Sequence, residues 1–314
     1  MLPRDLISGF FLILEIVIGF VGNSLIFVIY MYTFLVQPHL KKPIDVIFTH
    51  LTLANVLSIV FRLTPDVMSS FSVRLFLHDV GCKAVLYAYS VTRGLSICTT
   101  SLLSVFQAIT LMSSSSSWAW LKSKVSSCIF PSFLFFWIIN MSLFVPIIET
   151  VKAQSNFTVG SRYLQTHCQS NQIRYHTTVS FLSAIMIRDF LSVAIMMWAS
   201  LYMAILLFGH NSRTRHVHSS SSSSYSSSEH KATLSILLLV ASFIFFYCCN
   251  NFITFYLFYR PKRSPLLDRI SGILSSCYSI ICPYVLVNNR KIISKLISSC
   301  SGLKKFFSAR RFNA

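Results

Sequence analysis

The chain has 314 residues, of which 54% are hydrophobic and 11% are charged, and its mean hydropathy is +0.64. A soluble domain carries about 25% charged residues, so this composition excludes an ordinary water-soluble protein. The net charge of +18 would favour nucleic-acid binding in a soluble chain, but here the basic residues lie mainly in short gaps between apolar runs. That placement is typical of a membrane protein, and no nucleic-acid partner is expected.

Seven apolar segments are long enough to span a bilayer, which takes about 20 residues each. They lie at about 6–30, 44–64, 80–112, 125–148, 177–208, 232–259 and 266–288. We therefore predict an all-α membrane protein with a seven-transmembrane helix bundle over 6–290, a short N-terminus (1–5) and a basic tail (291–314). Segment 80–112 is the most polar, so we expect it at the centre of the bundle, away from lipid.

The first segment is expected to be a retained anchor. The apolar core of a signal peptide has only about 7–15 residues and ends at a small-residue cleavage site, which is absent here. Only Arg4 precedes the segment, whereas Lys41 and Lys42 follow it. Because basic residues favour the cytoplasmic side, we predict a plasma-membrane protein with an extracellular N-terminus and a cytoplasmic C-terminus.

Two runs of serine, at 113–117 and 219–224, lie in gaps that this topology assigns to the cytoplasm. Such runs are typical of flexible loops, and they are also potential phosphorylation sites on a basic surface. Enzyme signatures of the GxSxG, HExxH or phosphate-binding glycine-loop type are absent from the sequence, as are paired CxxC motifs for a metal. We therefore expect neither an enzyme nor a metal or cofactor site.

Two sequons test the topology. Asn156-Phe157-Thr158 lies in the large gap between the fourth and fifth segments, which is outside, whereas Asn140-Met141-Ser142 lies within the fourth segment. We predict that Asn156 is glycosylated and that Asn140 is not. Cys82 and Cys168 also lie on the outside, where disulfides persist, and they form either a bridge or two free thiols.

Charged residues inside membrane spans are costly and indicate function. Arg93 lies 11 residues beyond Cys82, about 16 Å deeper at the helical rise. Arg188 and Asp189 lie at a similar depth in the fifth segment, so we predict that Arg93 pairs with Asp189 across the two helices.

Two other charged positions lie nearer the bundle ends. Arg62 and Asp66 have the i, i+4 spacing of a local ion pair in the second segment. Glu15 in the first segment has no obvious partner in the sequence.

Several motifs depart together from the common rhodopsin-like pattern. Gly22-Asn23 fits that pattern, but Asn55 replaces the usual aspartate, the third segment lacks Asp-Arg-Tyr, the sixth lacks Cys-Trp-x-Pro, and the seventh has Cys282-Pro283-Tyr284. The chain instead resembles the vomeronasal type-1 receptors over about residues 10–295. The resemblance is carried by HLTLAN (50–55), GCK (81–83), RGLSICTTSLLSVFQAIT (93–110), NFT (156–158), IRD (187–189) and KATLSILLLVASFIFFY (231–247).

The resemblance implies a G-protein-coupled chemosensory receptor for small pheromone-like ligands, coupled to a heterotrimeric G protein of the inhibitory class. It also favours a Cys82–Cys168 bridge. Signalling would be a ligand-driven population shift of the bundle. The alternatives are a bitter-taste-type receptor and a small transporter or channel, although a transporter would be expected to show internal repeats. An opsin is disfavoured because 266–288 contains no lysine.

Two sets of residues are the candidate sites. The ligand pocket is expected in the outer half of the bundle, and the alternative role for its aromatic side chains is simply to pack the helices. Its predicted residues are Tyr87, Tyr89, Ser90, Arg93, Asp189, Phe252, Phe255 and Tyr256. The predicted G-protein contacts are Gln107, Lys122, Lys124, Arg213 and Arg215. Attraction to anionic membrane lipids is the alternative role for these basic residues.

Overall fold

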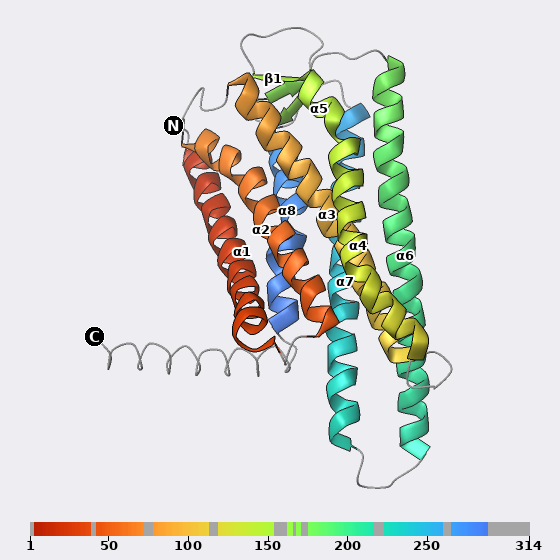
Figure 1. The fold of residues 1–314 in the computed structure, drawn as a ribbon. Helices are drawn as coiled ribbons and strands as arrows, with labels where there is room; N and C mark the ends of the chain where they lie inside the picture. The colour runs from red at the N-terminus through yellow and green to blue at the C-terminus, as the bar shows by residue number, and fades with distance from the viewer. Residues whose placement is uncertain are drawn as a thin grey trace, which may run out of the picture.

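A computed structural model describes residues 3–38, 42–71, 78–112, 119–153, 162–165, 168–170, 175–216, 223–259 and 265–287 (Figure 1). Its helices are α1 (Pro3–Val36), α2 (Pro43–Ser70), α3 (Asp79–Met112), α4 (Ala119–Leu143), α5 (Val145–Thr150), α6 (Tyr175–His216), α7 (Ser223–Tyr259) and α8 (Pro265–Val287). The short α5 follows α4 after Phe144, and Pro146 stands in its first turn.

The predicted seven-helix bundle is confirmed. Within the described ranges, six helices are long and apolar enough to cross a membrane, namely α1, α2, α3, α4 with α5, α6 and α7. The seventh, α8, has a shorter apolar stretch at Ile270–Leu286. Figure 1 shows these helices side by side, with α6 and α7 extending past the others at one end.

Helix α3 occupies the centre of the bundle, as its polarity predicts. In its most apolar stretch 67% of residues are buried, against 22% in α1, α4 and α6. Its buried hydroxyls donate back to the helix: Thr99 to the Leu95 carbonyl at 2.7 Å, and Thr100 to the Ser96 carbonyl at 2.8 Å. Because these bonds satisfy the hydroxyls locally, the polar helix avoids most of the cost of burial.

Small residues set the approach of α1 to α8. A Cβ on Gly22 would lie 2.9 Å from the Pro283 ring, and one on Gly19 would lie 2.9 Å from Ile280. In lipid, helices associate by close packing rather than by a hydrophobic driving force, so such glycines favour a tight interface.

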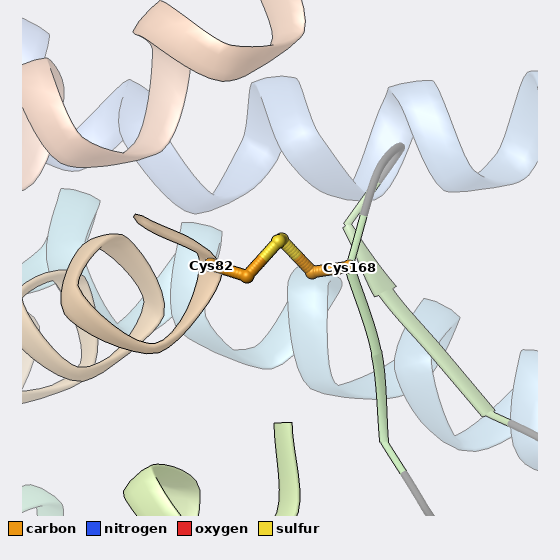
Figure 2. The surroundings of a disulfide bond; sticks show 2 residues. All are labelled: Cys82 and Cys168. Carbon is orange, nitrogen blue, oxygen red and sulfur yellow. A yellow bond between two sulfur atoms is a disulfide. The ribbon is translucent and has the colours of Figure 1, made fainter. Parts of the chain in front are cut away.

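One end of the bundle carries a small antiparallel sheet that we did not predict. It consists of β1 (Val151–Ala153), β2 (Arg162–Gln165) and β3 (Cys168–Ser170), in the order β1-β3-β2. Cys82 in the first turn of α3 is bonded to Cys168 of β3, with Cα atoms 5.7 Å apart (Figure 2). The predicted bridge is confirmed, and we call this end the disulfide end and the other the opposite end.

Three boundary predictions change. Helix α1 starts at Pro3, inside the predicted terminus 1–5, and continues to Val36, beyond the predicted end of the first span. The serine run at 219–224 is not wholly a loop, because α7 starts at Ser223. The run at 113–117, the sequon Asn156 and the tail 291–314 lie outside the described residues.

Candidate functional site

A small cavity lies among α2, α3, α7 and α8, near the middle of α3. Its volume is about 30 Å³, enough for roughly two water molecules. It is lined by Ser58, Tyr89, Arg93, Ser96, Ile97, Phe243, Phe246, Tyr247, Asn250, Leu274, Ser275, Tyr278 and Ser279. The lining combines apolar walls with a few polar groups and one arginine, which is the composition expected of a small-molecule site.

Arg93 projects from α3 into this cavity. Its guanidinium carbon lies 5.9 Å from the centre of the Tyr247 ring, within cation–π range. Arg93 also interacts with the Tyr89 hydroxyl, one helical turn away. Tyr89 and Arg93 are therefore confirmed neighbours on one face of α3, as their spacing predicts.

The predicted ion pair between Arg93 and Asp189 is not formed. Asp189 instead accepts from its neighbour Arg188, whose Nε lies 2.8 Å from Oδ1, and from the Tyr247 hydroxyl at 2.8 Å from Oδ2. Asp189 attracts Arg93 only at longer range. Both residues reach Tyr247 and so lie at a similar level of the bundle, but that level does not determine how a helix is rotated about its axis.

Asn140 of α4 completes the Arg188–Asp189 cluster. Its side-chain oxygen accepts from Nη1 of Arg188, and its amide donates to the Phe136 carbonyl at 2.8 Å. Asn140 is fully buried, and both charged side chains are at most 12% exposed. The cluster therefore joins α4 and α6 inside the membrane, and through Tyr247 it joins α7 as well.

Gly94→Ala is expected to disrupt this cluster, because a Cβ on Gly94 would overlap the Asn140 side-chain oxygen and the Arg188 guanidinium. Overpacking of this kind costs about 1–3 kcal/mol. We expect a lower melting temperature for the purified protein in detergent. Gly272→Ala is the matched control, since it makes the same change of helix propensity but meets the end of the Arg62 side chain at 2.9 Å and an Asp66 oxygen at 3.5 Å, without overlap as close as that at Gly94. Equal melting of the two variants would contradict the packing argument.

On the disulfide side of the cavity, Arg62 and Asp66 form the predicted local pair at 3.6 Å. The Arg62 guanidinium carbon lies 5.7 Å from the centre of the Tyr89 ring, and its Nε donates to the Ser275 hydroxyl at 3.2 Å. Tyr89 thus lies between two arginines, Arg62 and Arg93.

A buried polar network lies on the other side of the cavity, centred on Asn55. The Asn55 side-chain oxygen accepts from Ser96 at 2.7 Å and from Ser279 at 3.2 Å, which joins α2, α3 and α8. Asn23 extends the network to α1 by donating to the Ser279 carbonyl at 2.8 Å. We did not assign Ser96 or Ser279 to a site from the sequence. The sequence signal for this network was Asn55, which replaces the aspartate of the common rhodopsin-like pattern.

The comparisons with known proteins agree over nearly the whole chain. A family model described as the vomeronasal organ pheromone receptor family matches residues 6–299. Vomeronasal type-1 receptor 4 of Homo sapiens is 33% identical over 280 residues, which cover 87% of this chain and 91% of that protein. Olfactory receptor class A-like protein 1 of Danio rerio is 30% identical over 301 residues, 94% of this chain and 93% of that protein.

The chain belongs to the vomeronasal organ pheromone receptor family. It is therefore a multi-pass membrane receptor of the G-protein-coupled type, in which a small molecule is the signal. Membership decides against the bitter-taste-type and transporter alternatives, and it places the chain in a family of receptors rather than of enzymes.

Several residues predicted for the ligand site of this pheromone receptor lie elsewhere. Tyr87 faces α4 and donates to the Met141 carbonyl at 3.0 Å. Phe252 is 73% exposed and Tyr256 is 40% exposed, and neither lines the cavity. Ser90 is half-buried and is not part of the lining, while the side chain of Phe255 lies outside the described set. The wall from α7 consists instead of Phe243, Phe246, Tyr247 and Asn250.

The predicted G-protein contacts are only partly described. Gln107 is buried, and its amide donates to the Thr233 hydroxyl of α7 at 3.4 Å, so it lies inside the bundle rather than on its surface. Lys124 is exposed, with its amine 5.8 Å from the Trp120 ring centre. The side chains of Lys122, Arg213 and Arg215 lie outside the described set.

Proposed function

We propose that the chain is a plasma-membrane pheromone receptor that binds its ligand in the central cavity and activates an inhibitory-class G protein at the opposite end. The observation that carries the proposal is the cavity itself, with Tyr89 and Arg93 on one wall and the aromatic side chains of α7 on another. Ligand sites in helix bundles lie between helices and combine such walls.

The proposal places the disulfide end outside the cell. The Cys82–Cys168 bridge supports this orientation, because disulfides persist in oxidising compartments. The opposite end then faces the cytoplasm, together with Lys124 and the chain around Arg213. This arrangement also agrees with the preference of basic residues for the cytoplasmic side.

Ligand binding would move α7. A cavity of about 30 Å³ has room for roughly two water molecules, so its walls must shift to admit an organic ligand larger than acetate. Helix α7 contributes Tyr247 to that wall, and nearer the opposite end its Thr233 accepts a hydrogen bond from Gln107 of α3. A ligand that binds the opened arrangement more tightly would shift the population towards it, by no more than its differential affinity.

The test is a signalling assay in cells that express the chain with defined G-protein α subunits. We expect a fall in cyclic AMP with an inhibitory-class subunit and no response with a stimulatory one, using a panel of small organic compounds. Coupling only through the stimulatory class would contradict the proposed partner.

Reversal of the charge at Lys124 separates the two roles of the basic surface. Normal signalling by this variant would favour attraction to lipid over contact with the G protein.

Tyr89→Ala is expected to lower the potency of an active compound about tenfold, equivalent to about 1.4 kcal/mol, at normal surface levels. The reason is that Tyr89 lines the cavity and lies against Arg93. Tyr87→Ala is the matched control, two residues away on α3 and outside the cavity lining. A concentration–response curve that is the same for both variants would remove Tyr89 from the site.

Asn156→Gln is expected to abolish the mobility shift that glycosidase treatment produces in the wild-type chain, because Asn156 lies in the sequon that the proposed orientation exposes outside. Asn140 is fully buried within α4 and is expected to stay unmodified. A shift that survives Asn156→Gln and disappears with Asn140→Gln would overturn the topology.

A further inference from the structure

Three arginines lie in or beside the core of the bundle, and two of them have a carboxylate partner. Arg62 pairs with Asp66 at 3.6 Å, and Arg188 pairs with Asp189. Among the side chains that the structure describes, no carboxylate lies within ion-pairing distance of Arg93. The third arginine therefore places a positive charge on the cavity wall with no described carboxylate beside it.

Asp189 does not form an ion pair with Arg93, and both of its oxygens have other donors. Oδ1 accepts from Arg188, and Oδ2 accepts from the Tyr247 hydroxyl at 2.8 Å. Tyr247 meanwhile presents the face of its ring to Arg93. A ring face attracts a cation but does not replace a carboxylate as an acceptor for the five guanidinium N–H groups.

We propose that Arg93 recognises a ligand with a negatively charged head group, a small organic carboxylate being the simplest case. The proposal deepens the proposed function by naming the ligand class of the same cavity. A carboxylate at Arg93 would supply the missing charge and form charge-assisted, bidentate hydrogen bonds in a site of low dielectric constant.

The rest of the cavity fits the other part of such a ligand. Ile97, Phe243, Phe246 and Leu274 present apolar walls suited to an aliphatic or aromatic body. The volume of about 30 Å³ admits a head group the size of acetate, whereas a longer body requires the wall of α7 to move. For an anion with such a longer body, binding and displacement of α7 would therefore be coupled.

Acetate provides a test that does not depend on signalling. Purified receptor in detergent is melted in 100 mM sodium acetate, in sodium chloride at the same ionic strength, and in sodium chloride with added 100 mM acetamide. If acetate binds with a Kd of about 10 mM, the melting temperature should rise by about 2–4 °C in acetate alone. The rise should be lost in Arg93→Gln and kept in Lys83→Gln, which removes a charge from the same helix near the disulfide end.

Signalling then tests the assignment with matched acid and amide pairs: benzoate, 3-phenylpropanoate and octanoate, each with its primary amide. An active acid should be more potent than its amide, and Arg93→Gln should weaken it about 10- to 100-fold. Arg93→Lys should retain part of the response because it keeps the charge. Should Arg93→Gln fail to reach the surface, the acid–amide comparison in the wild-type receptor still shows whether the receptor prefers a negatively charged ligand to a neutral one.

The outcomes separate the two proposals. Equal melting in acetate and in sodium chloride with acetamide, or amides as potent as their acids, overturns the anion inference and leaves the receptor function standing. Stabilisation by acetate that depends on Arg93, with no G-protein response to any compound, supports the anion site and counts against the proposed signalling function.

Discussion

Asp189→Ala should cause the largest loss of stability of any substitution proposed for this receptor. It would leave Arg188 buried without its carboxylate partner and the Tyr247 hydroxyl without its acceptor. Removal of one partner of a buried ion pair costs about 3–5 kcal/mol. We therefore expect most of the protein to be retained inside the cell, measured as the surface fraction of an N-terminally tagged chain.

Two variants isolate the cause. Asp66→Ala removes a carboxylate from the other ion pair, which is longer, at 3.6 Å, and it should lower surface expression less. The double variant Arg188→Gln with Asp189→Asn removes both charges and should recover part of the loss. Surface expression of Asp189→Ala at the wild-type level would show that Arg188 finds another partner.

Loss of the bridge between Cys82 and Cys168 should have the second-largest effect. The bond joins residues 86 positions apart and holds the small sheet to the first turn of α3. Loss of a native disulfide typically costs about 2–5 kcal/mol. We expect Cys168→Ser to lower both the melting temperature and the surface level.

A double variant tests whether the effect of Cys168→Ser comes from loss of the bridge. The double change Cys82→Ser with Cys168→Ser should be no worse than either single change, because both remove the same bond. Cys128→Ser is the control, since Cys128 is a free and exposed cysteine of α4. Non-reducing peptide mapping of the wild-type chain that finds both thiols free would contradict the bridge.

Polarity and hydrophobic length were the informative signals in the sequence. Runs of apolar residues located the membrane helices because only helices and closed barrels satisfy the backbone in lipid. The polar composition of 80–112 predicted the central place of α3, because polar side chains avoid lipid. The bridge between Cys82 and Cys168 followed from their location and from the family resemblance. The sheet was missed because strands of three or four residues are too short to show periodicity.

The sequence by itself therefore determined the number of membrane-spanning segments, the central helix and the family. Only the tertiary structure decided which side chains meet: Asp189 pairs with Arg188 rather than with Arg93, and Tyr247 rather than Phe252 or Tyr256 lines the cavity. The physical reason is that lipid is as apolar as the core, so an apolar helix such as α7 carries no periodic pattern that marks its inward face. Its rotation is determined by packing against its neighbours, and that rotation leaves Arg93 facing the cavity.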